Sequence, residues 1–194
     1  MSDIYRKILS DREVSRRKFL KLGLVASASA FIPWGNLDAA ADFLSEERRL
    51  CIYNLQTKED MDIVYFNEGQ YLPDAMKQLN HIFRDHYNGL EKAIDKKLFD
   101  FLFAIQQKLH NKEPFHLISG YRSRRTNALL RKQNSRVAPK SLHIYGKAAD
   151  IRLPGNSLKL LRQTAYELKG GGVGFYPKSN FVHIDVGKVR FWRG

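Results

Sequence analysis

The stretch of the chain that says most about its fold is residues 141–150, with the sequence SLHIYGKAAD. Its pattern predicts a loop that turns into a strand, because Gly146 permits a tight turn and the two alanines let a strand pack closely. His143 lies in the predicted loop and Asp150 in the predicted strand. Either residue alone is usually structural, so it is the joint pattern S-x-H-x-x-G-x-A-x-D that indicates a candidate site.

A third candidate residue lies in another predicted strand, residues 181–185 (FVHID), where His183 is central. Two imidazoles and one carboxylate are ligand types that zinc prefers, and three protein ligands leave a fourth position open for water. His143, Asp150 and His183 are therefore candidate ligands of one catalytic metal ion. The same set suits several divalent ions, so it does not by itself distinguish zinc from manganese or iron.

Length and charge bound the remaining possibilities. The chain has 194 residues, enough for one domain and a targeting segment, and 33 basic against 20 acidic residues give it a net charge of +13. Such an excess favours polyanionic partners, among which DNA, anionic lipid and an acidic cell wall all qualify. The single cysteine, Cys51, excludes an internal disulfide and a cysteine-rich metal cage.

The first forty residues have the composition of a targeting segment. Residues 15–21 (SRRKFLK) are followed by an apolar, small-residue run at 22–32 and by DAAA at 38–41, which a signal peptidase accepts. The paired arginines and the Phe-Leu-Lys after them resemble a twin-arginine export signal. The apolar run is shorter than the roughly 20 residues of a membrane-spanning helix. We therefore expect a signal peptide over residues 1–40, cleavage near Ala40 or Ala41, and no stable membrane span afterwards.

Residues 41–194 read as a single α+β domain. We expect the first two strands to form a hairpin, residues 170–172 to form a flexible glycine turn, and the strands to form a small antiparallel sheet with flanking helices. The predicted strands are 50–55, 61–66, 115–118, 148–153, 173–176 and 181–186, and the predicted helices are 73–87, 95–109, 126–133 and 157–168, with Asp95 and Ser157 as caps.

A family resemblance covers most of residues 48–193. The segment 141–150, with 118–123 (ISGYRS) before it and 181–185 after it, resembles the LAS zinc peptidases. That group includes D-Ala-D-Ala carboxypeptidases and dipeptidases, murein endopeptidases and the hedgehog signalling domain. Residues 79–85 (LNHIFRD) and 171–185 (GGVGFYPKSNFVHID) make the chain more similar to the YcbK-type periplasmic murein endopeptidases. The resemblance implies a hedgehog/D-Ala-D-Ala-peptidase-like domain located in the periplasm.

The resemblance also implies roles for individual residues. His143, Asp150 and His183 would hold one zinc ion. Arg122 would bind substrate and steady charge on the attacked carbonyl, since its guanidinium is permanently charged and donates two parallel hydrogen bonds. Ser141 is a candidate hydrogen-bond partner for substrate, and a turn cap is the equally plain alternative.

The general base departs from the family pattern. In the better-known members an acid or a histidine stands two or three positions before the last zinc histidine, where this chain has Asn180 and Phe181. Neither side chain can take a proton from water. Asp185 would lie on the same strand face as His183, and it could act as the base or orient the histidine.

Five further residues could surround the site. His116 alternates with apolar neighbours just before Arg122 and could face the cleft, or it could be an ordinary strand residue. Four aromatic residues could wall the groove or pack in the core: Tyr121, Tyr145, Tyr176 and Trp192.

Together these features favour an exported zinc metallopeptidase that cuts peptide cross-links of peptidoglycan, with the twin-arginine machinery as a second partner. A carboxypeptidase that trims terminal D-Ala is the alternative within the same group. A peptidoglycan-binding module without turnover is the alternative outside the enzymes, favoured by the missing acid. Nucleic acid is not an expected partner, because no recognition motif is present and export removes the protein from it.

Overall fold

The computed structural model describes residues 47–135 and 137–194, which fall within one compact unit of the chain. The predicted signal peptide, residues 1–40, lies outside the described residues. In chain order the elements are β1 (Arg48–Asn54), β2 (Asp60–Asn67), β3 (Gln70–Tyr71), α4 (Pro73–Ile82), α5 (Lys96–Lys108), β4 (Phe115–Ser119), α6 (Arg124–Gln133), the short 3-10 helix η1 (Leu142–Tyr145), β5 (Ala148–Arg152), α7 (Leu158–Leu168), β6 (Gly172–Tyr176), β7 (Phe181–Asp185) and β8 (Arg190–Arg193).

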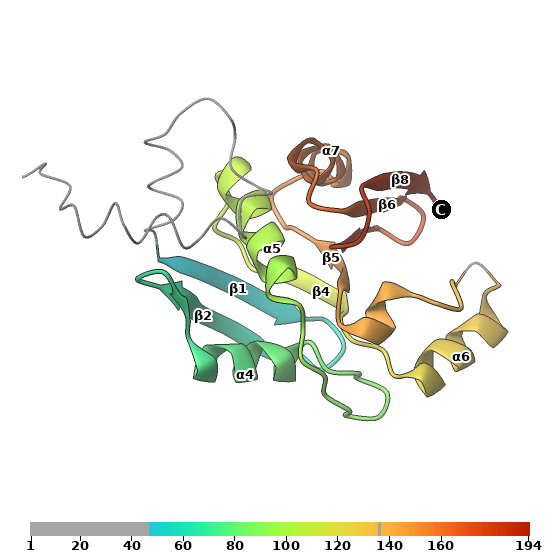
Figure 1. Ribbon diagram of the computed structural model, residues 1–194. Coiled ribbons are helices and arrows are strands. Elements are labelled where there is room, and N and C mark those ends of the chain that lie inside the picture. Colours follow the sequence, from blue (N-terminus) through green and yellow to red (C-terminus); the bar gives the residue numbers. More distant parts are fainter. Residues whose placement is uncertain (1–46, 136) are drawn as a thin grey trace, which may run out of the picture. The chain divides into compact units, whose positions relative to one another are not determined.

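All eight described strands form one sheet in the order β3-β2-β1-β4-β5-β7-β6-β8 (Figure 1). The predicted mixture of helices and strands is confirmed, but the prediction of a small antiparallel sheet is wrong. Strands β1 and β4 pair in parallel, as do β6 and β8, whereas the other neighbours are antiparallel. A parallel pair needs a long crossover connection, and α4 and α5 lie in the segment that carries the chain from the β1–β2 hairpin to β4. The edge strands β3 and β8 are too short to give an alternating pattern in the sequence.

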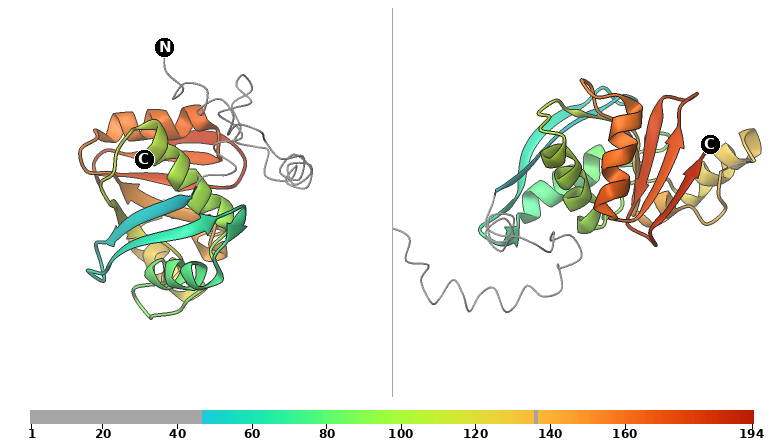
Figure 2. Two further views of the ribbon diagram at one scale, coloured as in Figure 1. Left: turned by 90° about the vertical axis from the view of Figure 1, so that its left-hand side faces the viewer. Right: turned by 90° about the horizontal axis from the view of Figure 1, so that it is seen from above.

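Helices α5 and α7 pack against each other on one face of the sheet (Figures 1 and 2). Helix α5 contacts β1, and α7 contacts β6 and β7. Fully buried side chains from neighbouring strands face these helices, among them Ile52, Leu117, Ile151 and Ile184. Because successive strand residues point to opposite faces, the residues between these positions point to the other face of the sheet.

The helix starts follow from caps. Asp95 accepts a hydrogen bond from the Lys97 amide at 3.1 Å and Ser157 accepts one from the Leu160 amide at 3.2 Å, so both predicted caps are confirmed. Helix α6 begins two residues earlier than predicted, because the hydroxyl of Ser123 caps it.

Helix α4 ends at Ile82 rather than at residue 87, and long-range contacts explain the difference. Phe83 is fully buried and its ring lies edge-on to Phe99 of α5, with 5.3 Å between the centroids. Asp85 then turns inward, where its carboxylate accepts the backbone amides of Tyr87 and Ser123. These contacts turn the chain away from the helix axis and bring it next to the end of β4.

Among residues 47–135 and 137–194, no helix combines the length and the apolar character that crossing a bilayer requires.

Candidate functional site

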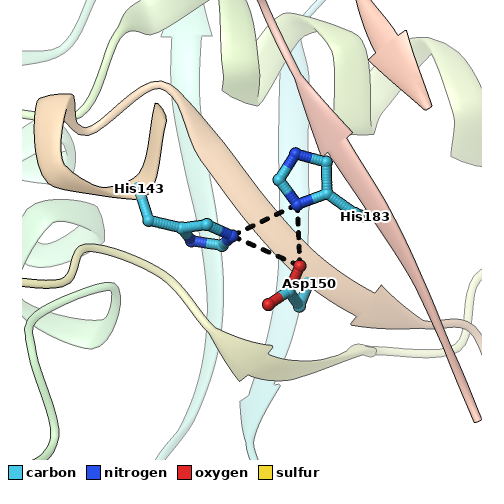
Figure 3. Close-up of side chains that lie close together, drawn as sticks. All are labelled: His143, Asp150 and His183. Atoms are coloured by element: carbon cyan, nitrogen blue, oxygen red, sulfur yellow. Dashed lines mark hydrogen bonds and ion pairs between the residues drawn. The ribbon is translucent and has the colours of Figure 1, made fainter. Parts of the chain in front are cut away.

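The three predicted metal ligands lie together on the sheet face opposite α5 and α7 (Figure 3). Asp150 of β5 and His183 of β7 are directly paired across the two strands. Their neighbours Ile151 and Ile184 face the helices, so both polar side chains point the other way. His143 reaches the same point from η1, just before β5 begins.

The three side chains converge through one atom each. His143 Nε2 lies 3.2 Å from His183 Nδ1 and 3.3 Å from Asp150 Oδ1, and His183 Nδ1 lies 2.9 Å from Asp150 Oδ1. Tetrahedral ligands with bonds of about 2.0–2.1 Å are separated by about 3.3–3.4 Å. The triangle is therefore close to the size that a small divalent cation needs, and these residues could hold a metal ion.

His143 is held by the chain around it. It is 1 % exposed, and its Nδ1 donates a hydrogen bond to the carbonyl oxygen of Gly120 at 2.7 Å, which leaves Nε2 as the free lone pair. Burial and the nearby Arg122 charge lower its pKa to about 4, so the imidazole is neutral at pH 7 as a metal ligand must be. Gly146 ends η1 at φ +65°, where a Cβ would lie 2.6 Å from the Ala93 carbonyl oxygen, so the predicted glycine turn is confirmed.

His183 is oriented by Asp185 from its other side. Its Nε2 lies 3.1 Å from Asp185 Oδ2, which leaves Nδ1 to face Asp150 and His143. Asp185 is fully buried and also accepts a hydrogen bond from Arg190 at 2.7 Å. Burial alone would raise the pKa of the Asp185 carboxyl, but the hydrogen bonds from His183 and Arg190 outweigh it and lower the pKa to about 2.

Two glycines of β6 let side chains from β8 reach the site. A Cβ on Gly172 would lie 2.5 Å from the guanidinium of Arg190, and one on Gly174 would lie 2.5 Å from the Trp192 indole. The Trp192 ring thereby comes to 5.2 Å from the His183 ring, measured between centroids. Gly172 is thus the first residue of a strand, and the prediction that all three glycines of residues 170–172 form a flexible turn is wrong.

Arg122 lies at the edge of the same cluster. Its Nη2 donates to Asp150 Oδ2, the carboxylate oxygen that faces away from the histidines, and its Nε donates to the Ser119 hydroxyl at 2.8 Å. Burial raises the pKa of the Asp150 carboxyl, but the two imidazoles and the Arg122 guanidinium beside it hold that pKa well below its usual range.

The remaining predicted residues take different positions. Ser141 precedes η1 but its hydroxyl makes no capping hydrogen bond, so the alternative of a turn cap is not supported. Asn180 lies in the turn before β7 with φ +53°, and Phe181 stacks on Tyr176 with 4.5 Å between ring centroids. Tyr176 also accepts a hydrogen bond from the Trp192 indole at 2.8 Å.

Two partners of the site were not predicted from the sequence. The carbonyl that accepts from His143 belongs to Gly120, directly after β4, and glycine is the residue type that allows the backbone to approach another group closely. Arg190 lies in β8, and no sequence signal pointed to its contact with Asp185, because that contact depends on the parallel pairing of β8 with β6.

The fold and the site define a class: a mixed α/β domain with a buried His-Asp-His cluster that could bind one metal ion. The family model described as peptidoglycan L,D-endopeptidase MepK matches residues 43–192, and the chain belongs to this family. The family resemblance drawn from the sequence is confirmed.

Curated relatives match over nearly their whole length. The peptidoglycan L,D-endopeptidase MepK of Escherichia coli (strain K12) is 41 % identical over 181 residues, which cover 93 % of this chain and 98 % of the relative. The probable peptidoglycan L,D-endopeptidase MepK of Haemophilus influenzae (strain ATCC 51907 / DSM 11121 / KW20 / Rd) is 37 % identical over 182 residues, which cover 93 % of this chain and 96 % of the relative.

Proposed function

We propose that this chain is a zinc-dependent endopeptidase that hydrolyses peptide cross-links of peptidoglycan, with the zinc ion held by His143, Asp150 and His183. The observation that carries the proposal is the convergence of one ligand atom from each of these residues in a chain of this family. The relatives are named as endopeptidases of peptidoglycan, which favours a cut within the peptide over removal of a terminal D-Ala. Zinc at such a site polarises the amide carbonyl and activates water near neutral pH.

Arg122 stabilises the negative charge that develops on the carbonyl oxygen. Its guanidinium is fixed beside the cluster by hydrogen bonds to Asp150 and Ser119, so that little reorganisation is needed during the reaction. The side chain is 14 % exposed and therefore still accessible from solvent. The Ser141 hydroxyl, which does not cap η1, is available to a substrate hydrogen bond.

Asp185 positions His183 and does not exchange a proton with the reacting water. A general base must lie within hydrogen-bond reach of the proton that it takes. The Asp185 carboxylate is fully buried and is shared among the His183 ring, Arg190 and the amides of Gly172 and Gly187. Of the two roles open to Asp185, orientation of the metal ligand is the one this environment supports.

The experiment is digestion of purified sacculi by the zinc-loaded protein, with mass analysis of the released fragments and of bound metal. His143→Ala is expected to lose bound zinc and to release no fragments. The matched control is His81→Ala on α4, an exposed histidine that contacts Glu91 at the surface. Hydrolysis that persists in His143→Ala without bound metal would contradict the proposal. Binding to sacculi without any released fragment, with zinc added, would instead favour a binding module.

We further propose that the protein reaches the periplasm by the twin-arginine route. The support is the SRRKFLK motif and the apolar run after it, together with a positive net charge that suits a wall polymer whose stem peptides carry carboxylates. Replacing both arginines of the motif, Arg16→Lys and Arg17→Lys, should leave the protein inside the cell. Cell fractionation shows where the double variant is located. Unchanged export of this variant would rule out the route.

A further inference from the structure

A second arginine near the cluster, Arg152, has no charged partner among the residues that the structure describes. Arg152 is two residues after Asp150 on β5, so its side chain points to the same face of the sheet about 7 Å along the strand. It is half-buried, and within residues 47–135 and 137–194 no carboxylate pairs with it. Its Nε is buried without a hydrogen-bond partner.

The other two arginines near the site have partners. Arg122 donates to Asp150, and Arg190 donates to Asp185. A buried donor without an acceptor costs stability, so an unpaired guanidinium beside a reaction site indicates that a ligand supplies the acceptor.

Residues with aromatic or imidazole rings flank Arg152 on the neighbouring strands. On one side, His116 of β4 pairs with Arg152, and Tyr53 of β1 pairs with His116 at 5.5 Å between ring centroids. On the other side, Ile151 pairs with Val182, which brings Phe181 next to Arg152, and Phe181 stacks on Tyr176. All of these rings are half-buried, as is Arg152 itself, so this part of the sheet face is partly open to solvent.

We propose that Arg152 binds a free carboxylate of the stem peptide, next to the amide that is cut, and thereby positions the substrate. This inference rests on the proposed function. The planar guanidinium can donate two parallel hydrogen bonds to a carboxylate. An extended peptide advances about 7 Å in two residues, the same distance that separates Arg152 from Asp150 along β5. A carboxylate one or two residues from the reacting carbonyl therefore reaches Arg152 while the amide lies at the cluster.

The test compares two cross-linked stem-peptide dimers, one with the free α-carboxylate beside the cross-link and one with that group converted to the carboxamide. The wild-type protein is expected to cleave the carboxylate form with a KM about 10- to 100-fold lower and a similar kcat, the effect of a charged hydrogen bond. Arg152→Gln should lose this preference and treat both peptides as the wild type treats the carboxamide. Arg152→Lys, which keeps the charge but not the paired donors, should retain part of the preference.

The matched control is Arg162→Gln on α7, which removes a positive charge on the opposite face of the sheet, where Arg162 lies over the Phe175 ring. It should leave the preference unchanged. Equal discrimination by wild type and Arg152→Gln, or cleavage of both peptides by the wild type with the same KM, would overturn the inference.

Binding of the same two peptides, measured by calorimetry in a His143→Ala background, tests Arg152 apart from hydrolysis. Tighter binding of the carboxylate peptide that is lost on substitution of Arg152 supports the subsite, even if the wild type cleaves neither peptide. Failure of the wild type to cleave either peptide would refute only the endopeptidase proposal. Equal affinity for both peptides would refute the subsite alone.

Discussion

Two aspartates at the site have opposite environments although both are buried. Asp150 presents Oδ1 to both candidate histidines and Oδ2 to Arg122, so its charge is used directly at the cluster. The Asp185 carboxylate contacts the three candidate ligands only at His183, and its other contacts are to Arg190 and to backbone amides. Substitution of either residue should weaken metal binding, but of the two only Asp150 offers a ligand atom to the candidate ion.

At the residue scale, Asp185→Asn is expected to reduce zinc affinity about 10- to 100-fold while zinc can still bind, because the amide no longer fixes the His183 ring as the carboxylate does. Competition with a chelator of known affinity measures the change. Activity should return when zinc is added in excess. Activity that stays lost at saturating zinc would instead indicate that Asp185 acts in the reaction itself.

At the scale of elements, one carboxylate of α5 accepts hydrogen bonds from three neighbouring strands, β1, β2 and β3. Asp100 accepts hydrogen bonds from Arg48 of β1 at 2.7 Å, Tyr65 of β2 at 3.1 Å and Tyr71 of β3 at 2.5 Å. Arg48 is 4 % exposed, so its charge depends on buried partners. Burial and the Asp100 charge raise the pKa of both tyrosines, which keeps their hydroxyls protonated as donors.

Asp100→Asn should therefore lower the free energy of unfolding by about 3 kcal/mol, because it removes the charged acceptor of the buried Arg48 guanidinium and of two tyrosine hydroxyls. Denaturant unfolding measures the loss. The control is Asp62→Asn, which removes the carboxylate of the exposed Arg49–Asp62 pair and should leave stability almost unchanged, because solvent screens the pair. Similar losses of unfolding free energy in both variants would contradict a special stabilising role of the buried Asp100 carboxylate.

The Glu59–Arg84 ion pair gives a pH-dependent prediction at the same scale. The hydrogen bond from Arg84 lowers the pKa of Glu59 to about 2, below the unfolded value of about 4.3. The pair's contribution is therefore complete above about pH 4.3 and is lost as the pH falls toward 2. Since Glu59 is 38 % exposed, solvent screening limits that contribution to less than about 1 kcal/mol.

Glu59→Gln should accordingly be less stable than wild type at pH 7, and the difference should vanish between pH 4 and pH 2. Unfolding curves across this range provide the measurement. Glu68→Gln, in the turn between β2 and β3, is the control and should track the wild type at every pH. A difference that persists at pH 2 would exclude the ion pair as its cause.

At the scale of the whole molecule, the candidate metal links segments that are distant in the chain. The ligands come from η1, β5 and β7, and the unfolded chain does not hold them together. Metal binding therefore stabilises the folded state by mass action, about 2.7 kcal/mol at a concentration 100-fold above Kd.

Removing zinc with a chelator should thus lower the Tm by several degrees, and added zinc should restore it. His143→Ala should show no such response. A wild-type Tm that is the same with and without zinc would mean that the cluster binds no zinc at the concentrations used.

The sequence by itself determined the features that depend on neighbouring residues. The β1–β2 hairpin, the caps at Asp95 and Ser157 and the turn at Gly146 were all predicted, because alternation, capping side chains and glycine act over a few positions. The candidate ligands were predicted because their residue types and spacing belong to a recognisable family pattern.

Only the tertiary structure decided what depends on contacts between distant segments. The sheet order and its two parallel pairings, the early end of α4, the Asp185–Arg190 contact and the unpaired charge of Arg152 all arise from strands that lie side by side but far apart in sequence. A single side chain carries no local signal of which strand lies beside it, so the sequence could supply the ligands but not their surroundings.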